Sequence, residues 1–307
     1  MITAVLLALA GLVGLALGGE LLVRGAVGIA RLAGMSPLLT GLVVVGSATS
    51  MPEMVTSVEA ALAGSPGIAW GNIVGSNIAN SLLILGIAAI VAPIALTGAG
   101  RRDAVSGLLA AVLIFGIALS GIGSVWIGIA LLVAICGYVY WRYNHPRPAI
   151  DEVEQSGPEP TWAKSGILFL LGLAALVAGG QALVTGAIEL ATIAGISETA
   201  IGLTVVAIGT SLPELAATLA AAWRGQSGLA LGNVLGSNIY NLLLIGGVTM
   251  TIAPISIPFE LVDLEMPVMV AASALLVLLC MFASRIGRWL GVLMVAAAIA
   301  NSVVVLS

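Results

Sequence analysis

The chain has 307 residues, of which 60% are hydrophobic and 8% charged, and its mean hydropathy is +1.20. A soluble domain of this length could not bury so much apolar surface, and apolar stretches of about 20 residues do not fit the short alternating strands of a membrane barrel. We therefore expect an all-α, multi-pass integral membrane protein. The net charge is −4 and no basic patch with interleaved aromatic residues occurs, so no nucleic-acid partner is expected.

Ten stretches along the chain are apolar and long enough to cross a bilayer as helices. A polar linker, residues 144–163, separates five of them in residues 1–143 from five in residues 164–307. The first stretch lacks the positive start of a signal peptide, so we expect it to remain as a helix. The first, second, sixth and seventh are long enough to be tilted or broken. The predicted spans are residues 3–31, 37–63, 67–92, 103–119, 124–143, 164–193, 198–223, 228–252, 264–283 and 287–305.

The two halves carry the same sequence pattern. Residues 19–86 align with residues 180–247 without a gap, with 33 identities in 68 positions. Because each half has an odd number of spans, the halves must insert in opposite orientations, as in many secondary transporters. The sequence therefore predicts two inverted-topology five-helix repeats, whose most similar parts are about residues 37–92 and 198–252.

The placement of charge predicts the orientation in the membrane. If the N-terminus is outside, every Lys and Arg falls in an inside loop or helix end, while the outside loops carry only carboxylates. Both termini are then outside and the linker is cytosolic. The outside carboxylates, Glu198, Glu260, Asp263 and Glu265, are interpreted as a solvated rim. The inside cations are Arg24, Arg31, Arg101, Arg102, Arg142, Arg147, Lys164, Arg224, Arg285 and Arg288.

A carboxylate recurs inside an apolar segment of each half. Gly-Ser-Ala-Thr-Ser-Met-Pro-Glu ends at Glu53, and Ala-Ile-Gly-Thr-Ser-Leu-Pro-Glu ends at Glu214, 161 residues later. Each is followed by Gly-Asn-x-x-Gly-Ser-Asn-x-x-Asn, which ends at Asn80 and Asn241. Since a charge at membrane depth is costly, a duplicated one indicates a functional site. Hydroxyls, carboxylates and carboxamides from both halves predict one shared cation site.

The ligand chemistry follows from these residue types. Pro52 and Pro213 each remove an amide donor and free a carbonyl one turn earlier, so backbone oxygens join the side-chain oxygens. An all-oxygen site suits hard cations such as Ca²⁺ and Na⁺ rather than Zn²⁺ or copper. Two facing glutamates are neutralised by one divalent ion, two monovalent ions or two protons, and an empty ionised pair would be very costly. Filling by one ion type or another is the physical basis of exchange.

Other polar residues have structural readings. The four remaining motif asparagines either line the site or cap and brace the helix breaks. Glu20 aligns with Gln181 and Glu59 with Ala220, so both glutamates are interpreted as structural or peripheral. The two cysteines, Cys136 and Cys280, are interpreted as buried packing thiols. The asparagines are Asn72, Asn77, Asn233 and Asn238.

The two motif pairs resemble the α-repeats of the cation/Ca²⁺ exchanger superfamily, and most closely its prokaryotic sodium/calcium exchangers. The resemblance covers both halves. It implies a ten-helix fold in which helices 2, 3, 7 and 8 form the ion-binding core and helices 1 and 6 slide across it. It also implies a secondary active antiporter that exchanges three Na⁺ for one Ca²⁺ by alternating access, with no cofactor and no protein partner. Asn241 stands where K⁺-dependent relatives carry Asp, which argues against K⁺ co-transport.

By the resemblance, twelve residues bind the transported ions. The two glutamates are Ca²⁺ ligands that also bind Na⁺, the two threonines offer backbone carbonyls to Ca²⁺, and the serines lie at flanking Na⁺ sites. Backbone carbonyls at Gly46 and Ala207 complete those flanking sites, and the asparagines lie at the central site. The implied metal-binding residues are Gly46, Thr49, Ser50, Glu53, Ser76, Asn80, Ala207, Thr210, Ser211, Glu214, Ser237 and Asn241.

Other functions fit the sequence less well. A cation/H⁺ exchanger of the same fold is the main alternative, because paired buried carboxylates can also bind protons. A channel would need a continuous pore rather than a closed site between inverted repeats. An enzyme is not expected, because the sole histidine, His145, falls in the linker and cannot contribute to a site at membrane depth. The compact chain suggests a prokaryotic inner membrane.

Overall fold

The computed structural model describes residues 1–306 except 97–99, 146–159, 195–208 and 255, and nearly all of these residues are helical. Within this part of the chain, eight helices are long and apolar enough to cross a membrane, and a bent pair of helices makes a ninth candidate. The expected helical membrane fold is therefore confirmed. The seventh expected span, 198–223, begins outside the described residues, so the count of ten and the placement of both termini stay predictions.

The described residues of the first half form eight α-helices, two π-helical segments and a short strand. They are α1 (Ile2–Ala33), α2 (Pro37–Thr40), η1 (Gly41–Val45), α3 (Gly46–Thr49), α4 (Met51–Leu62), α5 (Pro66–Ile78), η2 (Ala79–Ile84), α6 (Leu85–Val91), β1 (Ile94–Ala95), α7 (Arg101–Ser120) and α8 (Val125–Asn144).

The second half holds similar elements among its described residues. They are α9 (Trp162–Ile193), α12 (Leu212–Trp223), α13 (Ser227–Ile239), η4 (Tyr240–Ile245), α14 (Gly246–Ile252), the 3₁₀ turn η5 (Phe259–Leu261), α15 (Glu265–Phe282), β2 (Arg285–Ile286) and α16 (Arg288–Leu306). The two strands pair antiparallel, with Ile94 opposite Ile286.

Elements of the two halves repeat at the step seen in the sequence. The helices α4 and α12 begin and end 161 residues apart, and so do α5, η2 and α6 relative to α13, η4 and α14. The continuous helix α5–η2–α6 and its counterpart α13–η4–α14 each contain one π-helical segment, which the sequence did not predict. Such segments widen a helix by one residue per turn and frequently occur at functional sites.

The second expected span is broken, as its proline predicted. The helical stretch Pro37–Thr49 and the helix Met51–Leu62 meet at an angle of 42°. Ser50 lies at the break with φ −81° and ψ 5°, and Pro52 occupies the first turn of α4. Because proline has no amide hydrogen, the helical ladder cannot continue through this point. The break leaves backbone groups free in the middle of the span.

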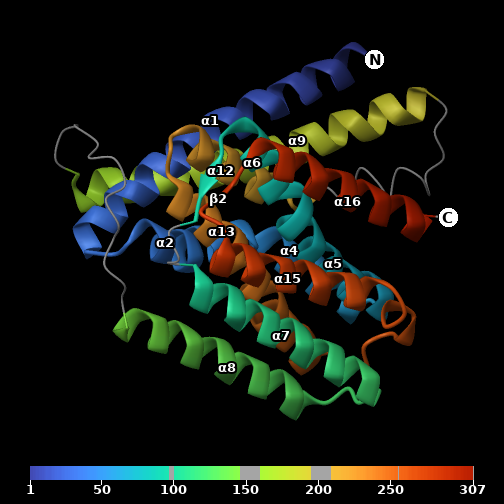
Figure 1. Ribbon diagram of the computed structural model, residues 1–307. Coiled ribbons are helices and arrows are strands. Elements are labelled where there is room, and N and C mark those ends of the chain that lie inside the picture. Colours follow the sequence, from blue (N-terminus) through green and yellow to red (C-terminus); the bar gives the residue numbers. More distant parts are fainter. Residues whose placement is uncertain (97–99, 146–159, 195–208, 255, 307) are drawn as a thin grey trace.

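A stripe of glycines holds α1 against α9. A Cβ at Gly18 would lie 2.7 Å from the backbone nitrogen of Leu176, and one at Gly179 would lie 2.8 Å from that of Leu15. Small residues let two helix backbones approach closely in lipid, where van der Waals packing drives association. Figure 1 shows the two long helices side by side along one face of the molecule. The other glycines of the stripe are Gly11, Gly25, Gly172 and Gly186.

The motif-bearing helices form the centre of the molecule. The span Ser227–Ile252 is 89% buried and the span Pro66–Val91 is 72% buried, whereas the span Arg288–Val305 is only 17% buried. Figure 1 shows α4, α5, α12 and α13 between the pair α1 and α9 on one side and α7, α8 and α15 on the other. A buried ion pair between Asp103 and Arg142, with oxygen and nitrogen 2.6 Å apart, joins α7 to α8.

Candidate cation-binding site

The two motif glutamates occupy equivalent places in the fold. Glu53 lies in the first turn of α4 and Glu214 in the first turn of α12, each directly after a proline. Both side chains are only 1% exposed. The free amides at the start of a helix favour negative charge, so these helix starts are suitable places for buried carboxylates. Neither carboxylate has a basic partner among the described residues.

Hydrogen bonds between the repeats bring the two motifs together. Ser211 donates its hydroxyl to Glu53 Oε1 at 3.1 Å. Ser237 donates to the carbonyl of Gly46 at 3.4 Å. These contacts join residues more than 150 positions apart, since the two partners of the first bond are separated by 158 residues. Two predicted site residues of each half therefore meet directly: Ser211 with Glu53 and Ser237 with Gly46.

Many polar atoms in this region are buried without a hydrogen-bond partner among the described residues. They include Glu53 Oε2 and both carboxylate oxygens of Glu214. Leaving a buried polar atom unpaired costs free energy, and far more if it is charged. A bound cation would satisfy these oxygens at once. The other unpaired atoms of predicted site residues are Ser50 Oγ, Asn80 Oδ1, Thr210 Oγ1 and both side-chain polar atoms of Asn241.

Two asparagines support the glutamates instead of pointing to an ion. Asn72 donates to the carbonyl of Glu53 at 3.2 Å and to the hydroxyl of Ser57 at 2.9 Å. In the other half, Asn233 donates to the carbonyl of Glu214 at 3.3 Å and to Thr218 at 2.8 Å. Both sets of bonds agree with the interpretation that these asparagines brace the neighbouring helix. Ser57 and Thr218 were missed from the sequence, although each lies one helical turn after its glutamate.

Two further contacts tie the halves to each other. Asn238 donates to Ser81 Oγ at 2.8 Å, which connects α13 with η2. Thr49 Oγ1 lies 3.3 Å from Asn233 Oδ1 and 3.1 Å from the carbonyl of Val45. These polar bridges fix the register of the two motif-bearing helices at the level of the site.

The remaining predicted residues lie on neighbouring segments. Ser76 is buried in α5, and Asn80 and Asn241 are buried in η2 and η4. The segment η2 contacts α12, and η4 contacts α4, so each asparagine lies on a segment that packs on the glutamate helix of the opposite half. No hydrogen bond joins these three side chains to the other predicted site residues in the described part of the chain. Ala207 lies outside the described residues.

The donor set contains oxygen atoms almost exclusively. No group of three or more His, Cys, Asp and Glu side chains that could hold a metal occurs among the described residues. Zinc and copper centres usually use nitrogen or sulfur ligands. Carboxylate, hydroxyl, carboxamide and carbonyl oxygens are the ligands preferred by Ca²⁺ and, as hard ligands, also suit Na⁺.

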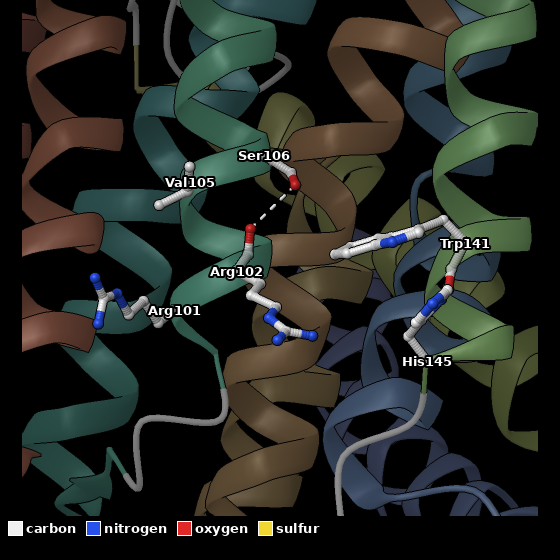
Figure 2. Close-up of a pocket in the computed structure, with 6 residues that line it drawn as sticks. All are labelled: Arg101, Arg102, Val105, Ser106, Trp141 and His145. Carbon is white, nitrogen blue, oxygen red and sulfur yellow. Dashed lines mark hydrogen bonds between the residues drawn. The ribbon is translucent and has the colours of Figure 1, made fainter.

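A separate hollow at the start of α7 and the end of α8 has the opposite character. Figure 2 shows that it is lined by two arginines and by aromatic and small side chains, with no carboxylate. The guanidinium carbon of Arg102 lies 5.9 Å from the ring centre of Trp141. Two positive charges repel a cation, so this hollow is not a second cation site. Its lining residues are Arg101, Arg102, Val105, Ser106, Trp141 and His145.

A helical membrane fold with two buried carboxylates at the starts of two repeat-related helices has the architecture of a cation transporter. Comparison with known families agrees with this class. The chain belongs to the sodium/calcium exchanger protein family, whose model matches residues 3–144 and 164–306. The resemblance seen in the motifs is therefore confirmed over both halves, and the family is one of exchangers rather than enzymes.

Similar proteins come from bacteria and archaea. The chain is 37% identical over 298 residues to the putative antiporter CaxA of Alkalimonas amylolytica, covering 94% of this chain and 93% of that protein. It is 34% identical over 331 residues to the sodium/calcium exchanger MaX1 of Methanosarcina acetivorans, covering 94% of each. Its fold matches the sodium–calcium exchanger NCX_Mj soaked without Na⁺ and Ca²⁺, with a TM-score of 0.87, 34% identity and 97% of both chains covered.

Proposed function

We propose that this protein is a secondary antiporter that exchanges Na⁺ for Ca²⁺ across a membrane by alternating access. The observation that carries the proposal is the pair Glu53 and Glu214, buried at matching helix starts, with three of their four carboxylate oxygens unpaired among the described residues. The membership of the exchanger family and the soaking of NCX_Mj with Na⁺ and Sr²⁺ support the choice of ions.

The charge of the site accounts for obligatory exchange. Two ionised carboxylates in a low-dielectric centre are very unfavourable when empty, since each would be a buried unpaired charge. One Ca²⁺ neutralises both, and so do Na⁺ ions. The protein therefore crosses between its two access states with the site filled, and one ion type replaces the other at each face. Exchange of three Na⁺ for one Ca²⁺, without K⁺, is the stoichiometry we propose.

The proposed ligands are the twelve residues predicted from the sequence. Ten helices in two inverted repeats, with both termini outside, would place the two motif pairs at the same depth and facing each other. The complete segregation of Lys and Arg to one side supports this orientation. The prokaryotic relatives support a place in the inner membrane of a prokaryotic cell.

Exchange of Ca²⁺ or another cation for H⁺ is the competing function. The same two glutamates could carry protons, because a carboxylate binds either a cation or a proton. The family includes proteins described only as antiporters, such as CaxA, so the coupling ion has to be measured.

The coupling ion can be identified in proteoliposomes that contain the purified protein. Vesicles loaded with Na⁺, with K⁺ or with acid are diluted into Na⁺-free buffer that contains radioactive Ca²⁺. We expect rapid Ca²⁺ uptake only in the Na⁺-loaded vesicles. Uptake driven by internal acid would contradict Na⁺ coupling and identify a cation/H⁺ exchanger. Uptake that requires internal K⁺ would contradict K⁺ independence.

A further inference from the structure

An ion-pair cluster joins α1 to the end of α12. Arg224, which directly follows α12, donates from Nε to Glu20 Oε2 at 2.6 Å, and its Nη2 contacts Glu20 Oε1. Arg24 donates to the same carboxylate at 2.7 Å from within α1. One carboxylate thus holds two guanidinium groups, and the contact from Arg224 is bidentate. Bidentate, charge-assisted contacts of this kind are among the stronger polar interactions of proteins.

The backbones of α1 and α12 are in close contact beside this cluster. A Cβ at Gly19 would lie 2.8 Å from the carbonyl oxygen of Ala216 and 3.1 Å from Cβ of Ala220. The helix α9, which corresponds to α1 in the second half, makes no comparable contact with α4 among the described residues. The packing of the two halves is therefore unequal in this conformation.

The sequence repeat breaks at these charged positions. The step of 161 residues pairs Glu20 with Gln181, Arg24 with Thr185 and Ala63 with Arg224. Ala63 directly follows α4 as Arg224 directly follows α12, so the positions correspond in the fold as well. An ion pair can therefore form between α1 and α12, while α9 and α4 lack the charges for its counterpart.

In an inverted-repeat transporter, the two access states arise when the repeats move relative to each other around a fixed site. The unequal packing of the halves is then exchanged between the states: α1 leaves α12 and α9 packs on α4. We propose that Glu20, with Arg24 and Arg224, is a latch that stabilises only the state in which α1 packs on α12. This inference rests on the proposed antiport. The latch biases which face of the membrane the cation site opens to.

The burial of the latch determines its strength. The side chains of Glu20 and Arg224 are 35% and 23% exposed, so water screens the pair in part. The latch should bias the equilibrium between the states without locking it, as a transporter that visits both states requires. In the predicted topology the latch joins the cytosolic half of α1 to the cytosolic end of α12, so it disfavours the state open to the cytosol.

The latch can be tested by measuring half-saturating Ca²⁺ at each face. Right-side-out and inside-out membrane vesicles from the same cells present opposite faces to the buffer. The substitution E20Q should lower half-saturating Ca²⁺ at the cytosolic face and raise it at the other, changing their ratio by roughly three- to tenfold. R224Q should change the ratio in the same direction. The double substitution E20Q/R224Q should change it little further, because either single substitution already removes the ion pair. E59Q is the matched control on an exposed glutamate of α4.

A transplanted latch separates a conformational role from a merely structural one. The double substitution Q181E/A63R adds the missing pair between α9 and α4 and should shift the ratio in the same direction as E20Q, by stabilising the opposite state. The single substitutions Q181E and A63R should have little effect. Equal changes at both faces, or no shift with Q181E/A63R, would overturn the proposal.

A second measurement does not depend on transport. Spin labels at exposed positions 17 of α1 and 223 of α12, in a background where exposed Cys136 is replaced by Ser, report the separation of the two helices without ions. E20Q and Q181E/A63R should both increase the population with the longer separation, and an unchanged distribution would overturn the latch. If wild-type vesicles do not exchange Na⁺ for Ca²⁺, the proposed function is contradicted but the latch is not. The spin-label distances then still test the latch, because they do not depend on transport.

Discussion

Each glutamate of the candidate site depends on an asparagine that lies 19 residues further along the chain. The asparagine binds the backbone carbonyl of the glutamate and a hydroxyl one turn later, so it fixes the first turn of the helix that carries the carboxylate. In the second half, Asn233 is 1% exposed and also lies against Thr49 of the first half. The first turns that carry the two carboxylates are therefore held in place by these asparagines.

Replacing Asn233 should destabilise the protein measurably. N233A leaves the carbonyl of Glu214 and the hydroxyl of Thr218 without their partner, and each buried unpaired group costs about 1–3 kcal/mol. T218V removes one hydrogen bond and keeps the shape, so it should cost about 1 kcal/mol. Thermal unfolding of the purified protein in detergent measures both. The control is N144A, because Asn144 is exposed at the end of α8; equal unfolding midpoints for N233A and N144A would contradict the bracing role.

The residue types of the site were predictable from the sequence, but their division of labour was not. A duplicated glutamate after a proline predicts a buried carboxylate at a helix break, because few other roles explain a charge at that depth. Asparagine, in contrast, can bind an ion, cap a helix or brace a neighbour with the same side chain. Only the three-dimensional contacts of Asn72 and Asn233 distinguish these roles.

At the level of helices, the break after Thr49 was predictable because Pro52 removes a hydrogen-bond donor. The π-helical segments η2 and η4 were not, since no residue type enforces an extra residue in a helical turn. Asn238, just before η4, bonds to Ser81 of η2, and this contact joins residues far apart in the sequence. Local sequence therefore predicted the interruption caused by proline but not the two π-helical segments.

The glycine stripe between α1 and α9 gives a prediction at this scale. G179A would place a methyl group 2.8 Å from the backbone nitrogen of Leu15, which cannot yield without moving α1. We expect a loss of about 1–3 kcal/mol of stability, the usual cost of overpacking. G166A lies on the same helix with no atom within 4 Å of the new methyl group, so it is the matched control. Unfolding midpoints that fall equally in both variants would contradict close packing at Gly179.

For the whole molecule, the proposed stoichiometry makes transport sensitive to voltage. When three Na⁺ leave a vesicle and one Ca²⁺ enters, one net positive charge leaves. An inside-positive potential should therefore speed Ca²⁺ uptake into Na⁺-loaded vesicles, and an inside-negative potential should slow it, with about 2.3 kcal/mol of driving force per 100 mV. Potentials set with K⁺ gradients and valinomycin test this. Uptake that does not respond to the potential would indicate two Na⁺ per Ca²⁺ instead.

The duplicated motifs also explain why the general architecture could be predicted from the sequence. The same motif pair in both halves predicted that distant residues would meet, and bonds such as Ser211 to Glu53 show that they do. The unequal packing of α1 and α9 could not be predicted from the repeat, because a repeat alone predicts equal packing of both halves. The repeat does lose its symmetry at Glu20, Arg24 and Arg224.

The account depends most on one cation site shared by Glu53 and Glu214. The most direct test is Na⁺-driven Ca²⁺ uptake by proteoliposomes containing E53Q, E214Q or, as the control, E59Q on the exposed side of α4. A neutral amide keeps the size of the side chain but removes a charge that the buried site needs. We predict that either of the first two substitutions abolishes uptake while E59Q transports like the wild type. Wild-type uptake by both E53Q and E214Q would contradict the shared site.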